Sequence, residues 1–328
     1  MKKKLLLLVP VLLLMAADVG HKWPELSIEA EKKRVELLGI DSTGPGNAAA
    51  AYAPYLTDEA PVLKSDAWDK AMDVDILGPE NAADKEVVDK ALEELEDELA
   101  SLIKGSRRKD YEFWGKFMEL DKEKDVISQP VPSYVNFLHL SKFMVARSQR
   151  LDKAGDYEGA KESLLAIGRT GNHFSRDYYL IGYMVGTALK STAAKHLAKL
   201  EDSHGNKEAA AKWLLYKDLM DTRQKSYYKF TSYVTKAEEE EVKSLLLNED
   251  VPFSFRFEAL IWQHFCVEGG LTFNFNTLKC IVTDTPDWVL EIEEELASRD
   301  PLYKQYIDIL RAQKPSDAIS FREWLVAP

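Results

Sequence analysis

Apolar residues recur at steps of three and four through most of the chain from residue 79 to residue 247, and this periodicity constrains the fold most strongly. Between Asp84 and Ile103 they are Val87, Val88, Ala91, Leu92, Leu95, Leu99, Leu102 and Ile103. On a helix these positions form one apolar stripe, which must pack against another element. Further helices are predicted at 110–120, 133–153, 157–168, 173–201, 207–220 and 226–247. Long helices joined by short turns favour an all-α fold of packed antiparallel hairpins.

A short pattern occurs twice at the turns between these predicted helices. Residues 155–160 read Gly-Asp-Tyr-Glu-Gly-Ala, and residues 205–210, fifty positions later, read Gly-Asn-Lys-Glu-Ala-Ala. Glycine allows the positive φ of a tight turn, and a small alanine lets two helices approach closely. We therefore expect Ala160 and Ala210 at helix contacts, and Lys161, one step further round the helix, on the surface.

The first turn resembles the inter-helix turn of tetratricopeptide-type repeats, well over residues 134–170 and weakly over 174–222. That family also prefers a small residue twelve positions before the alanine, where this chain has Ser148 and Ala198. Lys207 stands where the first unit has a tyrosine, and a spacing of 50 exceeds the usual repeat length of about 34. The resemblance implies stacked helical hairpins in the middle of the chain and, more weakly, peptide binding.

The chain divides into four predicted regions. Residues 1–17 form a separate N-terminal segment, 18–77 an irregular leader, 78–250 the helical-hairpin domain, and 251–328 a mostly helical region packed on that domain. Short helices are expected in the leader at 27–38 and 48–56, and a loop at 61–77. The alternation of phenylalanine with polar residues predicts a small β-ribbon near 253–275, with a helix over 257–267 as the alternative.

The N-terminal segment is typical of an export signal. Lys2, Lys3 and Lys4 precede an uncharged apolar run from Leu5 to Ala17. A helix of that length reaches about 20 Å, less than the hydrocarbon core of about 30 Å. We expect cleavage near residue 18 and an extracytoplasmic protein, periplasmic or secreted. The bulky Met15 near the cleavage position leaves an uncleaved membrane anchor as the alternative.

The charge of the chain excludes one class of partner. The formal net charge is −12, and it becomes −15 without the three lysines of the N-terminal segment. Nucleic-acid binding needs clustered Lys and Arg, so we expect no nucleic-acid partner. An acidic body is also repelled by anionic membranes, so membrane contact is expected only through an uncleaved N-terminal segment.

The chain has two cysteines, Cys266 and Cys280. In an oxidising compartment they are candidates for a disulfide closing a 15-residue loop, which the chain-entropy model values at about 3 kcal/mol. The alternative is two buried thiols acting as small apolar residues. A metal site is not expected, because zinc needs four ligands and only His264 lies near Cys266.

The sequence contains no strong catalytic motif and predicts no cofactor. His264 and Glu268 are four residues apart, so on a helix they share a face and form a candidate base and orienting acid. His173 and Asp177 have the same spacing. For both pairs the alternative is a hydrogen-bonded structural contact.

Aromatic residues give the better indication of binding. Tyr178, Tyr179, Tyr183, Tyr227 and Tyr228 lie on two predicted helices of the hairpin stack. They are either large core residues or the lining of a concave face suited to a peptide or glycan. The sequence thus favours a non-catalytic binding or assembly protein of the cell envelope with a protein or peptide partner. The alternatives are a helical extracytoplasmic hydrolase or lyase using residues of 251–287, and a structural subunit of an envelope complex.

Overall fold

The computed structural model describes residues 26–79, 81–119, 130–177, 179–234, 239–256, 259, 271–274, 279–282, 294–298, 304–305 and 308. The fold divides into two compact units. The hairpin unit comprises residues 28–113 and 132–227, and the C-terminal unit comprises 1–27, 114–131 and 228–328. Residues 28–77, predicted as an irregular leader, therefore belong to the same unit as the hairpins. The division between the units falls within a helix, at residues 227 and 228.

The described residues are predominantly helical, which confirms the all-α prediction. The hairpin unit contains α2 (Ile28–Leu38), β1 (Gly44–Asn47), α3 (Ala49–Leu56), the 3-10 helix η2 (Pro61–Lys64), α4 (Asp66–Met72), α5 (Ala82–Glu94), α6 (Glu96–Ser106), β2 (Arg108–Asp110), α7 (Val135–Lys153), α8 (Tyr157–Phe174), α9 (Leu180–Ser203) and most of α10 (Lys207–Val234). The C-terminal unit contains the rest of α10, with α11 (Glu239–Leu247), β3 (Leu271–Asn274) and β4 (Lys279–Val282).

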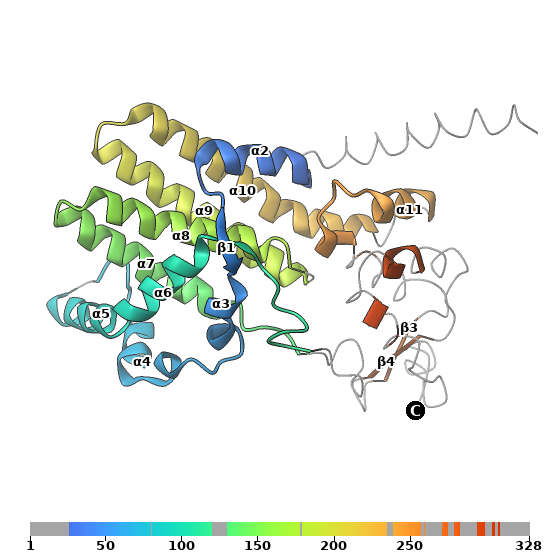
Figure 1. Cartoon of the computed structure of the whole chain (residues 1–328), viewed down its shortest axis with the longest axis horizontal. Coiled ribbons are helices and arrows are strands. Elements are labelled where there is room, and N and C mark those ends of the chain that lie inside the picture. Colours follow the sequence, from blue (N-terminus) through green and yellow to red (C-terminus); the bar gives the residue numbers. More distant parts are fainter. Residues whose placement is uncertain are drawn as a thin grey trace, which may run out of the picture. The chain divides into compact units, whose positions relative to one another are not determined.

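Helices α7, α8 and α9 and the first part of α10 form the stack that organises the hairpin unit (Figure 1). Gly155 turns the chain between α7 and α8 with φ of 85°, and Gly205 does so between α9 and α10 with φ of 79°. Both values lie in the left-handed region that favours glycine. The Asp156 side chain then caps α8 by accepting a hydrogen bond from the Gly159 N–H at 2.9 Å. The two glycine turns predicted from the repeated pattern are therefore present.

The small residues of the repeated pattern lie inside the stack, as expected. Ala160 and Ala210 are both buried, and so are Ser148 and Ala198. The prediction for Lys161 was wrong. Its side chain is only 31% exposed, and its Nζ lies 2.7 Å from the Oε1 of the buried Glu201.

Helices α8 and α9 approach each other closely at two glycines. A Cβ placed on Gly171 would lie 2.5 Å from the carbonyl oxygen of Gly186, and one on Gly186 would lie 2.6 Å from the carbonyl oxygen of Gly171. Real Cβ atoms do not come so close to backbone oxygens, because the electron shells overlap. Backbone therefore meets backbone here, and only glycine fits at either position.

Several helix boundaries differ from the predicted ones. The single helix expected at 84–103 is divided at Leu95 into α5 and α6, and the loop expected at 61–77 contains η2 and α4. Residues 173 and 174 end α8 rather than beginning α9, and α10 runs without a break through the expected gap at 221–225. The short helices expected at 27–38 and 48–56 are confirmed as α2 and α3.

The helix expected at 110–120 is wrong. Residues 108–110 form β2, which pairs in parallel with β1, and residues 111–119 are not helical. The Asn47 side chain fixes this contact because its Oδ1 accepts from the Glu112 N–H at 2.9 Å and its Nδ2 donates to the Glu112 carbonyl at the same distance. Segments more than sixty residues apart in the sequence are thus joined.

The C-terminal unit contains a two-stranded ribbon. Its strands lie at 271–274 and 279–282, whereas the ribbon was predicted near 253–275. The antiparallel strands β3 and β4 place Phe273 opposite Cys280. Residues 253–256 are helical instead of extended. The alternative helix over 257–267 lies mostly outside the described residues.

Candidate functional site: a cavity between α7 and α9

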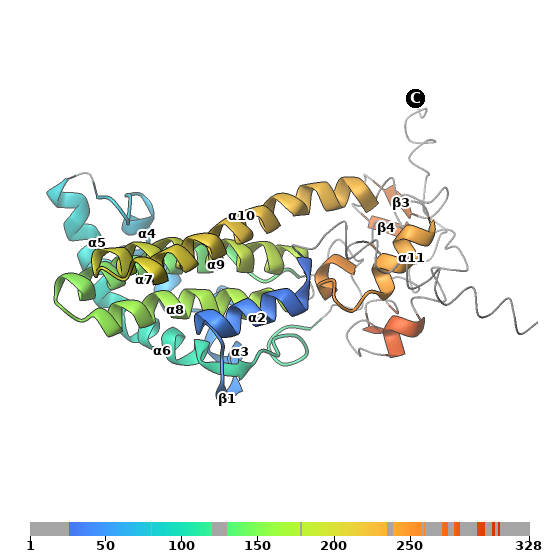
Figure 2. The ribbon, with the colours of Figure 1, turned by 90° about the horizontal axis from the view of Figure 1, so that it is seen from above.

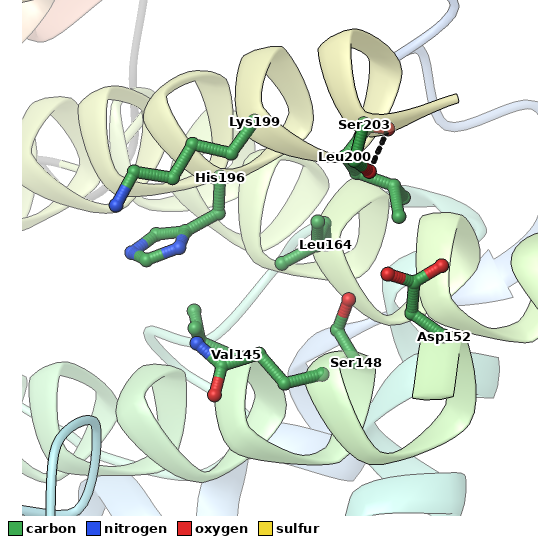
Figure 3. Close-up of a pocket in the computed structure, with 9 residues that line it drawn as sticks. Val145, Ser148, Asp152, Leu164, His196, Lys199, Leu200 and Ser203 are labelled. Carbon is green, nitrogen blue, oxygen red and sulfur yellow. Dashed lines mark hydrogen bonds between the residues drawn. The ribbon is translucent and has the colours of Figure 1, made fainter. Parts of the chain in front are cut away.

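A cavity of about 210 Å³ lies between α7 and α9, with α8 beneath it. Its walls combine three apolar side chains with six polar ones (Figure 3). The apolar residues are Val145, Leu164 and Leu200, and the polar residues are Ser148, Gln149, Asp152, His196, Lys199 and Ser203. The cavity is thus an apolar hollow with a polar rim.

Helical spacing brings these residues together. The four contributions of α7, from Val145 to Asp152, are separated by three, one and three residues, which places them on one face of that helix. The four contributions of α9, from His196 to Ser203, have the same spacing. Leu164 of α8 closes the space between the two faces. Serines at both walls leave room that larger side chains would fill.

The two ends of the cavity differ in charge. The Lys199 and His196 side chains point together to one end, whereas Asp152 projects at the other (Figure 3). The Asp152 carboxylate is held in place by His204, whose Nε2 lies 2.7 Å from Oδ1. The His204 ring packs in turn on Tyr157, with 4.6 Å between the ring centroids. The acidic end therefore has a fixed geometry, supported by the α7–α8 and α9–α10 turns, which lie side by side.

His196 is neutral at physiological pH. Burial lowers its pKa to about 4, with Lys199 and Lys195 adding repulsion that disfavours the imidazolium. A neutral imidazole both donates and accepts hydrogen bonds. The rim at this end therefore offers one cation and one group that pairs with either a donor or an acceptor.

The size of the cavity limits what it can hold. Sites for small molecules and cofactors usually enclose about 300–1,000 Å³, whereas a cavity of about 150 Å³ is enough for benzene. At about 210 Å³ this cavity suits a single large side chain better than a nucleotide or other cofactor.

A second polar group, around His173, is structural. The His173 Nε2 lies 2.9 Å from the Arg108 carbonyl oxygen, which can only accept, so this nitrogen carries the proton. Nδ1 therefore accepts from the Tyr52 hydroxyl at 3.0 Å. Burial lowers the pKa of His173 to about 3, with a further contribution from Arg176. Both ring nitrogens are engaged and the residue is 1% exposed, so it is a core histidine rather than a base.

Asp177 does not orient His173 directly. Its Oδ2 accepts a hydrogen bond from the Tyr111 hydroxyl at 3.0 Å, and the Tyr111 ring stacks on the His173 ring. The pair predicted from its spacing of four is thus linked through a tyrosine. Asp177 is also buried, so no solvent-borne substrate reaches either group.

The predicted aromatic binding surface is not assembled from its described members. Tyr183 is 2% exposed and belongs to the core, and Tyr179 is half-buried. Tyr178 and the side chains of Tyr227 and Tyr228 lie outside the described residues.

The other predicted site residues also fall largely outside the described part of the chain. His264, Cys266 and Glu268 lie there, and of Cys280 only the backbone, in β4, is described. The proposed disulfide and the candidate acid–base pair therefore stay predictions.

Over the described ranges, no group of three His, Cys, Asp or Glu side chains is placed to hold a metal ion. No helix in that part of the chain is long and apolar enough to cross a membrane.

Sequence analysis did not identify the cavity. His196 and Ser203 belong to no motif in the sequence, and the spacing of Ser148 predicted only a close helix contact. The spacing of the polar residues on α7 and α9 was visible, but which two helices face each other was not.

No protein-family model matches this chain, and comparisons with curated proteins and with solved structures find no match.

Proposed function

We propose that the protein is a non-catalytic binding module that takes one large side chain of a protein or peptide partner into the α7–α9 cavity. The observation that carries this proposal is the combination of an apolar hollow with a rim that is basic at one end and acidic at the other. The apolar part supplies affinity through burial, and the rim supplies orientation. The expected export segment at 1–17 places this binding outside the cytoplasm, in the periplasm, in the medium or at a membrane anchor.

The state of the polar groups supports binding over catalysis at this site. The Ser203 hydroxyl donates to the Leu200 carbonyl of its own helix at 2.8 Å. Asp152 is engaged by His204. A nucleophile needs a base within hydrogen-bond reach, and both of these groups are instead held by structural partners. The rim is therefore suited to positioning a partner, whether in transient binding or as part of an envelope assembly.

The proposal can be tested with displayed peptides. Random peptides are selected on the full chain, and the affinity of the selected peptides is then measured by calorimetry. Ser203→Trp should fill the mouth of the cavity and weaken binding at least about tenfold, which corresponds to about 1.4 kcal/mol. Lys212→Trp places the same ring on the exposed surface of α10 and should leave affinity unchanged.

Thermal melts of both variants show whether each still folds. The proposal also predicts that the selected peptides share one large apolar or aromatic side chain. Equal affinity for the wild type and for folded Ser203→Trp would show that the cavity is not the binding site.

A further inference from the structure

A second site lies where α2 meets the stack, away from the α7–α9 cavity. One carboxylate, that of Glu31 on α2, receives two cations and a phenol. Its Oε1 lies 3.0 Å from the Lys190 Nζ and accepts from the Tyr216 hydroxyl at 2.8 Å, and its Oε2 lies 3.0 Å from the Arg223 Nη1. Lys190 belongs to α9, whereas Tyr216 and Arg223 belong to α10. We call these three residues the cradle.

The cradle is buried and built on rigid helices. The Lys190 and Arg223 side chains are 1% and 2% exposed. The stem of Lys190 packs against Gly171 of α8, since a Cβ on that glycine would lie 2.8 Å from the Lys190 Cγ. The glycine contact between α8 and α9 therefore also fixes the position of the lysine. Both cations belong to helices of the stack, α9 and α10, and not to α2.

Electrostatics in the cradle strongly favours a bound anion. Burial alone raises the pKa of Glu31, but the charges of Lys190 and Arg223 outweigh this and lower it to about 2. Two buried cations without an anion raise the free energy of the folded state, because no opposite charge compensates them in a medium of low dielectric. The geometry also has a preference, since each of the two oxygens faces a different cation. A carboxylate meets both cations at once, whereas a monatomic anion has no second oxygen.

The helix that supplies Glu31 lies at the edge of the stack (Figure 2) and has few buried residues of its own. Val35 is the one buried residue of α2, and the Glu29–Lys33 ion pair on its outer face is exposed. The next residue past the helix, Gly39, has φ of 67°. The chain is then fixed at Ile40, whose carbonyl accepts from the Asn172 Nδ2 at 2.9 Å. A hinge of this form lets α2 move while residues after 40 stay in place.

We infer that the Lys190–Tyr216–Arg223 cradle is a carboxylate-binding site that Glu31 occupies in cis, and that an external carboxylate binds when α2 turns away at Gly39. Glu31 has the advantage of a tethered ligand, which corresponds to an effective concentration in the millimolar range. A competitor replaces it by binding at higher concentration or by making contacts beyond the carboxylate. Helix α2 is in this sense an inhibitory segment of the site.

The first test removes the tethered carboxylate. Glu31→Ala in the full chain should lower the melting temperature by about 10 °C, from the cost of breaking a buried pair in a domain of this size. Sodium acetate should then raise the melting temperature saturably, and sodium chloride at equal ionic strength should not. Sodium sulfate shows whether the cradle prefers carboxylates or takes any oxyanion. Equal effects of acetate, chloride and sulfate would overturn the inference.

Two controls make this test specific. Glu29→Ala removes an exposed carboxylate from the same helix and should show no acetate effect beyond that of chloride. Glu31→Ala combined with Arg223→Met should lose the acetate effect. An acetate effect that survives in the double variant would place the binding elsewhere.

The second test uses the unaltered protein and decides the question alone if Glu31→Ala does not fold. Hydrogen exchange is measured in acetate and in chloride at equal ionic strength. Exchange at residues 28–38 should rise several-fold in acetate, because α2 is displaced, while the centre of α9 should stay protected. Identical exchange of α2 in both salts at the highest concentrations would refute displacement. Neither test depends on peptide binding in the α7–α9 cavity.

Discussion

Replacing either glycine of the α8–α9 contact with alanine should destabilise the protein, although the same change in an ordinary helix stabilises it. Gly171 and Gly186 each lie within a helix, where alanine is favoured over glycine by about 0.5–1 kcal/mol. At these positions, however, the new methyl group would meet a backbone carbonyl oxygen at 2.5 or 2.6 Å. A backbone oxygen cannot rotate away as a side chain can, so the helices must separate.

The expected loss of unfolding free energy follows from these two opposing effects. Overpacking costs about 1–3 kcal/mol in a well-packed core, so after the propensity gain we expect a net loss of about 0.5–2 kcal/mol for each single variant. In a domain of this size each kcal/mol corresponds to about 2–4 °C of melting temperature. The double variant should lose less than the sum of the two, because one separation of the helices relieves both clashes.

Thermal and urea denaturation of Gly171→Ala, Gly186→Ala and the double variant provide the measurement. Thr192→Ala, a half-buried position of α9, is the control, and it should be close to neutral. A Gly186→Ala protein that melts at or above the wild-type temperature would show that the backbones do not touch.

Three further predictions concern a partly buried ion pair, a core histidine and the cysteines. Lys161→Met removes the ion pair of Glu201 and should cost about 1–2 kcal/mol in urea denaturation, since the tyrosine and asparagine that also donate to Glu201 remain. The folded state disfavours the charged form of His173 (pKa about 3). Stability present at neutral pH should therefore fall as the pH drops from about 6.5 towards 3, and His173→Gln should make that fall shallower. Protein isolated without reductant should carry no alkylatable thiol if Cys266 and Cys280 are paired.

Each of these predictions has a defined opposite outcome. Lys212→Met loses only an exposed pair and serves as the control for the Lys161 variant. Equal stability of the two variants would show that the ion pair of Lys161 with Glu201 contributes nothing measurable. A His173 imidazole that titrates above pH 6 by NMR would contradict its placement in the core. Two alkylated cysteines in protein from its native host would rule out the bridge.

Hydrophobic periodicity and turn residues predicted those parts of the fold that short stretches of sequence determine. The apolar stripes of 133–153 and 157–168 correspond to α7 and to most of α8, and the glycine turns between helices were visible in the repeated pattern. Non-local contacts were not predictable in this way. The segment 110–120 was assigned to a helix because its partner strand, β1, lies about sixty residues earlier, and no short window contains both.

The candidate sites escaped prediction for related reasons. Glycine has no side chain, so the contact between Gly171 and Gly186 leaves no trace in hydrophobic periodicity. Glu31 was assigned to no role, because a glutamate on a short polar helix looks solvated until its buried partners, 159 residues further on and beyond, are known. The α7–α9 cavity is equally a product of packing, since the polar residues of its rim would suit an ordinary exposed surface.

The contact between Gly171 and Gly186 also limits how α9 can move relative to α8. Where two backbones touch, there is no side chain to compress, so α9 cannot move closer to α8 at this point. Lys190 lies four residues after Gly186 in α9. The cavity residues of α9, which begin at His196, follow further along the helix in the same direction. The contact therefore fixes the separation of α8 and α9 at a point shared by two neighbourhoods, that of Lys190 and that of the cavity.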